Sequence, residues 1–197
     1  GIKLWEEVYA DFNLIPRPAG NTGVQMGGWF NKEINTPSDY EGLKMRMPGL
    51  GGRTIEKLGA TPVLLAGPDV LPSLASGAVD AAEWICPAAD LGAGLYQAAK
   101  YYYGPGWHEP STLLDLSMDL KAWESLDSAT QGLITDMTKS FNMSVFSRFQ
   151  AINGPALQKL TGEHGVTIKT FPDEVLIALG NAAGEVVSER GSINSET

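Results

Sequence analysis

The sequence predicts an α/β fold with a mostly parallel sheet and a long helix in its carboxyl-terminal part. Between residues 42 and 85, short apolar segments with strand patterns alternate with helical segments. Such alternation is typical of a parallel sheet covered by helices. Residues 128–160 keep helical spacing over a length that predicts one long helix. In chain order, strands are expected at 43–47, 61–65 and 79–85, and helices at 54–58 and 70–76, the second one stopped by Gly77.

The segments before residue 42 predict a helix, two strands and a turn. Apolar residues at helical spacing predict a first helix from Leu4 to Phe12. A short strand is expected at 14–18, a turn at 20–23 and a buried strand at 24–30. Further on, the glycine-rich stretch 49–52 is expected to form a turn, and it lacks the lysine and the spacing of a phosphate-binding loop.

After residue 89 helical and strand patterns both occur, and from Leu120 the pattern becomes more helical. A helix is expected at 90–99, a rigid aromatic loop at 101–110, strands at 112–118 and 166–171, and a last helix from 172 to about 188. The chain is thus predicted to have four parts: an α/β lobe at 1–88 that carries Gln25, Arg46 and Glu83, a crossing segment at 89–127 that contributes to another lobe, helices and a strand at 128–190 that return to the first lobe, and a frayed tail at 191–197.

The composition excludes several classes of partner. With 14 Lys and Arg against 23 Asp and Glu, the formal net charge of −9 argues against nucleic acid and against an anionic membrane surface. The single cysteine, Cys86, excludes an intrachain disulfide. No apolar run reaches the roughly 18 residues that a membrane-spanning helix needs. An acidic protein that binds an anion must gather its positive charge locally, which draws attention to Arg46.

Arg46 lies near the end of the expected strand 43–47, and open α/β sheets bind ligands at the carboxyl ends of their strands. Its guanidinium offers two parallel donors that match a carboxylate, and it resists deprotonation. The alternative is an ordinary surface arginine at the edge of the sheet.

Gln25 and Glu83 lie in apolar surroundings, where a polar side chain needs a partner. For Gln25 a backbone partner explains the sequence as well as a ligand does. Glu83 follows two alanines and requires a cation, and a hard ion with oxygen ligands would meet that need. For Trp84 and Trp107 the alternative to a binding role is a place in the core.

Four longer motifs follow one another along the chain: GNTGVQMGGWF at 20–30, GLKMRMPGLGG at 42–52, GAVDAAEW at 77–84 and YYYGPGWHEP at 101–110. Together they resemble the solute-binding proteins of tripartite ATP-independent periplasmic (TRAP) transporters. The most similar subgroup captures 2-oxo or 2-hydroxy carboxylic acids together with a metal ion. The resemblance runs from about residue 4 to about residue 189 and implies lobes like those of periplasmic binding proteins.

The resemblance also implies roles for single residues. Arg46 stands at the position of the arginine that holds the substrate carboxylate. After residue 84 the subgroup usually continues with glycine, proline and tyrosine, whereas 85–89 here read ICPAA, so the class of acid is better defined than its identity. No catalytic residue or catalytic cofactor is implied. Ligand contacts are implied for Gln25, Arg46, Trp84, Trp107 and His108, and contacts to a bridging sodium or calcium ion for Gln25, Glu83, Trp84 and Glu109.

The resemblance further implies a periplasmic location, a small carboxylate as ligand and TRAP membrane permease subunits as partners. It implies an amino-terminal portion with a signal peptide ahead of residue 1, and a homodimer of the full-length protein through the terminal helix. Two other functions fit the residues: a metal-assisted enzyme with Glu83 as base and Arg46 as carboxylate anchor, or a ligand-sensing domain. Against the enzyme, no serine, cysteine or lysine stands beside a convincing base.

Overall fold

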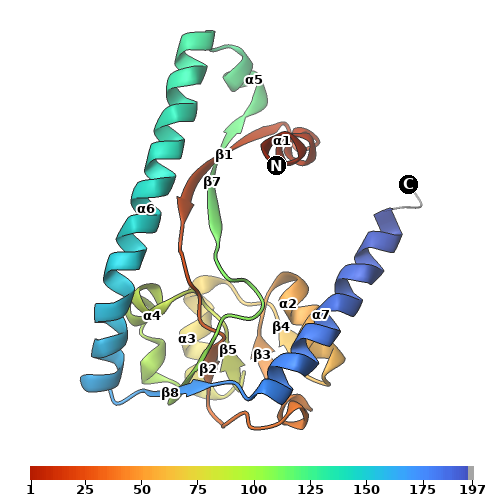
Figure 1. Ribbon diagram of the computed structural model, residues 1–197, viewed down its shortest axis with the longest axis vertical. Coiled ribbons are helices and arrows are strands. Elements are labelled where there is room, and N and C mark those ends of the chain that lie inside the picture. The colour runs from red at the N-terminus through yellow and green to blue at the C-terminus, as the bar shows by residue number, and fades with distance from the viewer. Residues whose placement is uncertain (195–197) are drawn as a thin grey trace. The chain divides into compact units, whose positions relative to one another are not determined.

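The computed structural model describes residues 1–194, which form two compact units (Figure 1). Unit 1 comprises residues 1–23 and 111–151, and unit 2 comprises residues 24–110 and the described part of the chain from residue 152 onward. These boundaries differ from the four expected parts because residues 14–21 pair with residues 113–119, which join two distant stretches of chain in unit 1. Gln25, Arg46 and Glu83 all lie in unit 2.

Unit 1 is built on a two-stranded antiparallel sheet. Gly20 and Asn21 belong to its first strand, because they pair with Leu114 and Leu113, so the expected turn begins two residues too early. The long helix predicted at 128–160 is confirmed, and it continues from unit 1 into unit 2. Among the described residues no helix is apolar enough over a sufficient length to cross a membrane. The elements are α1 (Ile2–Ala10), β1 (Leu14–Asn21), β7 (Leu113–Asp119), α5 (Leu120–Glu124) and the first part of α6 (Ser128–Gly162).

Arg17 joins the elements of unit 1. Its Nη1 donates to the Glu6 carboxylate at 2.5 Å and to the Pro16 carbonyl at 2.7 Å. Its Nε donates to Thr135 Oγ1 at 3.4 Å, and its Cζ lies 4.6 Å from the centroid of the Trp123 ring. The guanidinium of Arg17 is thus held by groups of α1, β1, α5 and α6.

One face of unit 1 carries an open apolar groove of about 820 Å³ between the sheet and α6. On α6, the side chains of Leu133, Met137 and Phe141 are 62%, 61% and 59% exposed. Asp136 is the charged side chain among the residues that line the groove. An apolar groove with an acidic side chain is unsuited to a carboxylate, so the groove is a poor candidate for anion binding.

Unit 2 contains a six-stranded sheet in the order β4-β3-β5-β2-β6-β8. Strand β2 is antiparallel to both of its neighbours, and the other three pairings are parallel, which confirms the predicted mostly parallel sheet. The strands are β2 (Gly28–Phe30), β3 (Lys44–Arg46), β4 (Thr61–Val63), β5 (Ala81–Ala82), β6 (Tyr101–Gly104) and β8 (Thr167–Thr170). The helices are α2 (Gly49–Lys57), α3 (Gly67–Ser76), α4 (Pro87–Ala93), α7 (Asp173–Asn194), and the short 3-10 turns η1 (Pro37–Tyr40) and η2 (Leu95–Gln97).

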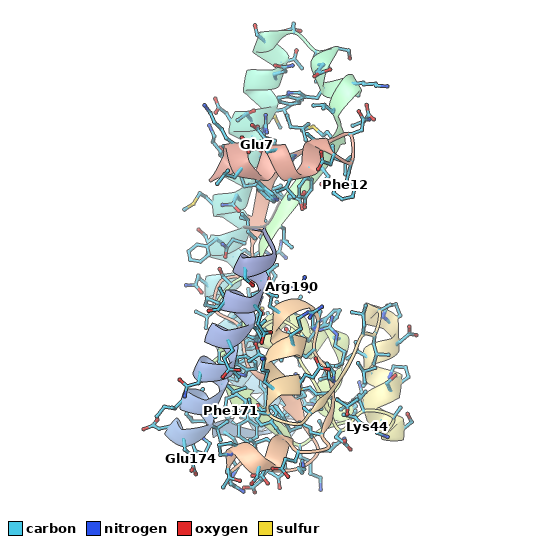
Figure 2. All side chains as sticks on the ribbon, turned by 90° about the vertical axis from the view of Figure 1, so that its right-hand side faces the viewer. Glu7, Phe12, Lys44, Phe171, Glu174 and Arg190 are labelled. Carbon is cyan, nitrogen blue, oxygen red and sulfur yellow. The ribbon has the colours of Figure 1, made fainter. Side chains whose placement is uncertain are left out.

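The unit 2 sheet is buried on both faces. Phe30 and Tyr103 enter one core together with Phe171, which lies just before α7 (Figure 2). Their neighbours Trp29 and Tyr102 enter a second core on the opposite face, where the two rings stack with their centroids 4.1 Å apart. Successive side chains of a strand point to opposite faces, so these short strands supply both cores.

Several expected boundaries are wrong for identifiable reasons. Residues 101–104 form β6 inside the sheet, between β2 and β8, and not an aromatic loop. The stretch 49–52 is the first turn of α2. Gly94, with φ of +73°, ends α4 at Ala93 and divides the helix expected at 90–99. The expected stop of α3 is confirmed, because Gly77 follows it with φ of +75°.

The strands at 24–30 and 79–85 are shorter than expected, and the last helix is longer. The strands are limited to Gly28–Phe30 and Ala81–Ala82. They pair through Trp29 with Ala82 and Phe30 with Ala81. Helix α7 continues to Asn194, so residues 191–194 are helical and not a frayed tail. Residues 195–197 lie outside the described chain. Lys57 of α2 forms ion pairs with Glu185 and Glu189 of α7, which supports the extension of this helix.

Asp90 is a buried carboxylate in the second core. Its Oδ2 accepts hydrogen bonds from Trp29 Nε1 and from the Tyr102 hydroxyl, both at 2.8 Å. Its Oδ1 accepts from the Ile85 backbone N–H at 3.0 Å. These bonds favour the charged form, but the loss of water outweighs them, and burial raises the pKa of Asp90 to about 6.

Substitution of Asp90 is expected to change how stability depends on pH. The folded pKa of about 6 exceeds the ordinary value of 3.8, so the folded protein binds this proton more tightly than the unfolded chain. The protonated carboxyl therefore makes its full contribution to the free energy of unfolding below the pKa of the unfolded chain. This contribution is lost as pH rises through the pKa of the folded protein. Relative to Asp90→Asn, the wild-type free energy of unfolding should fall by up to about 3 kcal/mol across this range.

Urea denaturation at a series of pH values measures this difference. The exposed Asp136 provides the control, and Asp136→Asn should keep the wild-type pH profile. Parallel profiles for the wild type and Asp90→Asn would contradict a raised pKa.

Candidate functional site

The candidate site begins at the carboxyl end of β3. Arg46 is the last residue of this strand and is opposite Val63 of β4 and Ala82 of β5, both in parallel register. Because β5 ends at Ala82, Glu83 follows directly, and its backbone N–H donates to the Arg46 carbonyl at 3.0 Å. Strand order therefore places these two charged residues side by side, at the edge where the sequence predicts ligand binding.

Arg46 and Glu83 form a buried ion pair. Arg46 Nη1 donates to Glu83 Oε2 at 2.7 Å and to the Glu83 carbonyl at 2.6 Å. The two side chains are 11% and 3% exposed. The second carboxylate oxygen, Oε1, lies 3.4 Å from His108 Nε2, and the His108 side chain is 5% exposed. One carboxylate is thus shared by an arginine and a histidine.

Trp84 covers the guanidinium of Arg46. The Arg46 Cζ lies 5.1 Å from the centroid of the indole ring, within the range of a cation–π interaction. On its other side the ring reaches Gly67 at the start of α3, where an added Cβ would lie 2.9 Å from the ring edge. A larger residue than glycine would displace the ring, so Gly67 helps to place Trp84.

Trp107 and His108 supply further polar groups to this end of the sheet. Their rings meet edge to face with centroids 5.4 Å apart, and Trp107 also packs against the first core. Arg46 Nε, Trp107 Nε1 and His108 Nδ1 are buried, and none has a hydrogen-bond partner among the described residues. Buried polar groups without partners are rare in folded proteins, and here three gather in one region. An acceptor such as a carboxylate would satisfy the two N–H donors of Arg46 and Trp107.

Gln25 is buried close to these residues, whereas Glu109 is not. Gln25 is 1% exposed, and its backbone carbonyl accepts a hydrogen bond from the Gly106 backbone N–H at 3.1 Å. The next residue, Met26, donates its N–H to the Ile85 carbonyl at 3.1 Å, so the Gln25 segment runs beside the segment of Glu83 and Trp84. Glu109 is exposed and has no ion pair or hydrogen bond within the described chain. The structure thus brings together most of the predicted site residues and leaves Glu109 at the surface.

The oxygen atoms in this region fit a hard cation. Glu83 offers a carboxylate, Gln25 a buried amide and Trp84 a backbone carbonyl, which are the kinds of ligand that sodium and calcium prefer. No group of three or more histidine, cysteine, aspartate or glutamate side chains is arranged for a metal within residues 1–194. A cation here would therefore depend on one buried carboxylate and on neutral oxygens.

Sequence reasoning missed two features of the site. It did not expect Arg46 and Glu83 to pair with each other, as they do in the structure. It also did not single out Asp90, which holds the Ile85 N–H two residues after Glu83. An aspartate inside the apolar stretch 87–93 was the available signal, because burial of such a carboxylate requires partners.

Comparison with known proteins gives the family. Residues 4–192 match the family described as "Bacterial extracellular solute-binding protein, family 7" (DctP). The chain belongs to this family. The predicted resemblance is thereby confirmed, and the family is one of extracellular binding proteins and not of enzymes.

Individual relatives agree with this membership. The chain is 40% identical over 192 residues to a monocarboxylate 2-oxoacid-binding periplasmic protein of Nostoc sp. strain PCC 7120. The aligned region covers 98% of this chain and 52% of the relative. A TRAP periplasmic solute-binding protein of Pseudoalteromonas atlantica T6c, solved with bound sodium and pyruvate, is 39% identical with a TM-score of 0.93 over 100% of this chain and 60% of that one. A TRAP solute-binding protein of Bordetella bronchiseptica RB50, a dimer solved with calcium and picolinate, is 38% identical with a TM-score of 0.91 over 96% and 56% of the two chains.

These likenesses confirm the predicted fold class. The chain spans about half the length of the curated relative that it matches.

Gly106 is expected to be intolerant of a side chain. In Gly106→Ala the new Cβ would lie 2.7 Å from the Gln25 carbonyl oxygen and 2.8 Å from its carbon, and backbone atoms cannot rotate away. The substitution should lower the free energy of unfolding by about 1–3 kcal/mol, as overpacking does. Gly92→Ala in α4 is the control, because an added Cβ meets nothing within 4 Å there. Urea denaturation of both variants tests this, and equal losses would refute the steric argument.

Proposed function

We propose that the protein is the solute-binding component of a TRAP transporter and that unit 2 binds a small 2-oxo or 2-hydroxy monocarboxylate. The observation that carries the proposal is Arg46, a buried guanidinium at a strand end whose Nε has no hydrogen-bond partner among the described residues. A carboxylate accepts two parallel N–H bonds from such a fork. The relatives solved with pyruvate and picolinate support this class of ligand.

The surrounding residues have separate roles in this proposal. Arg46 holds the carboxylate of the acid, and Trp84 keeps the guanidinium in place and shields it from water. Trp107 and His108 add polar groups from the loop after β6. Gln25 offers an amide for the 2-oxo or 2-hydroxy oxygen. Small size is part of the proposal, because the Trp84 ring lies over the guanidinium and the Trp107 ring lies beside His108 at the same end of the sheet.

A sodium or calcium ion completes the proposed site. Glu83, the Gln25 amide and the Trp84 carbonyl would hold it, with Glu109 as a further ligand supplied by the loop. The ion contributes positive charge beside the oxygens of the acid. The relatives that hold sodium with pyruvate and calcium with picolinate support this assignment.

Delivery and assembly follow from the same proposal. A protein of this family that binds a solute would pass it to membrane permease subunits of the TRAP system in the periplasm. A homodimer is part of the proposal, and the dimeric relative of Bordetella bronchiseptica supports it.

Arg46 is expected to be required for binding. Arg46→Lys keeps the charge but removes the fork, and Arg46→Ala removes both, so each should weaken the binding of pyruvate in the presence of calcium by about a hundredfold or more. Isothermal titration calorimetry measures the affinities. Arg53→Ala is the matched control, because Arg53 is exposed on α2 and its loss changes the net charge equally.

The acid should be recovered unchanged after the titration, since a binding protein breaks no bond. Wild-type affinity in Arg46→Ala would refute the role of Arg46. Conversion of pyruvate would refute the binding function in favour of an enzyme.

A further inference from the structure

The guanidinium proposed to hold the ligand already holds a carboxylate of the protein. Arg46 Nη1 lies 2.7 Å from Glu83 Oε2, and the pair is screened from solvent, with exposures of 11% and 3%. A carboxylic acid that docks on Arg46 presents the same chemical group as Glu83. Glu83 occupies Nη1 and leaves Nε without a partner, but it already neutralises the guanidinium, so the acid and Glu83 compete for one positive charge.

Glu83 is also the buried carboxylate of the proposed cation ligands, since Glu109 is exposed. In the structure its two oxygens face Arg46 and His108. A cation that binds the Glu83 carboxylate has to weaken its ion pair with Arg46. The cation and Arg46 therefore compete for one carboxylate.

We infer that Glu83 is an internal counter-ion that couples the two binding events. When a cation takes over Glu83, Arg46 becomes available to the acid, and when the acid takes over Arg46, Glu83 becomes available to the cation. By thermodynamic linkage each partner raises the affinity of the other by the same factor. The inference rests on the proposed function and adds to it a reason why cation and acid bind together.

This coupling differs from that of a cation that only bridges the acid and the protein. A bridging cation increases the affinity for the acid through direct contact, and loss of Glu83 or Arg46 would then simply weaken binding. For these losses the counter-ion role instead predicts a higher affinity when the acid or the cation is titrated without the other. Removal of Glu83 strengthens the binding of the acid without cation, and removal of Arg46 strengthens the binding of the cation without acid.

The test is a set of calorimetric titrations with calcium alone, pyruvate alone and each in the presence of saturating amounts of the other. In the wild type, calcium should raise the affinity for pyruvate about tenfold or more, and pyruvate should raise that for calcium equally. In Glu83→Gln, pyruvate without calcium should bind several-fold more tightly than to the wild type, and the enhancement by calcium should disappear. In Arg46→Gln, calcium without pyruvate should bind several-fold more tightly.

Arg53→Gln is the control for charge, because it removes the same positive charge from an exposed position of α2. Its affinity for calcium should stay at the wild-type value, and circular dichroism should show that all variants are folded. Equal calcium affinities of Arg46→Gln and the wild type, or a calcium effect that persists in Glu83→Gln, would overturn the counter-ion role.

The wild-type titrations need no variant and separate the two proposals. Pyruvate binding that is independent of calcium overturns the coupling and leaves the binding function intact. Absence of pyruvate binding in the presence of calcium overturns the proposed function.

Discussion

The unit 2 sheet is covered on both faces, and this constraint decides where charged side chains can stand. Trp29 and Phe30 enter opposite cores, so a charged residue at either position would be buried without water. In the inner strands β3, β5, β2 and β6, charged side chains therefore stand only at or beyond the strand ends. Strands β3 and β5 are parallel neighbours, and their ends lie at the same edge, which brings Arg46 and Glu83 into contact. The ion pair at the candidate site is thus a consequence of strand order.

A buried ion pair is a weak source of stability, because the desolvation of two charges offsets their attraction. The proposed binding role gives a better reason for the Arg46–Glu83 pair than stability does. Arg17, the buried arginine of unit 1, provides the contrast. Its Nε and Nη1 donate to Thr135, Glu6 and the adjacent backbone carbonyl, which is a structural arrangement. Arg46 keeps Nε without a hydrogen-bond partner among the described residues, and this difference supports its proposed role as a ligand residue.

Sequence patterns predicted elements whose signals are local. The end of α3 at Gly77 and the length of α6 follow from glycine and from helical spacing. Strand β6 was missed because three consecutive tyrosines show no periodicity and its partner β8 lies far along the chain. Arg46 and Glu83 were each predicted as site residues, but their pairing depends on strand order, which the sequence does not reveal. His108 and Glu109 are neighbours in a loop, where no pattern indicates that one is buried and the other exposed.

The stretch 85–89, which departs from the subgroup pattern, has a structural role in this chain. Pro87 begins α4, and the Ala88 N–H donates to Asn153 Oδ1 at 3.1 Å. At its other end the Ile85 N–H is held by Asp90. The segment that carries Glu83 and Trp84 is therefore anchored immediately after these residues. These anchors come from residues 85–90 and 153, whereas Glu83 and Trp84 themselves make the contacts with Arg46. Under the proposed function, the departure from the subgroup pattern therefore bears on the size of the acid more than on the recognition of its carboxylate.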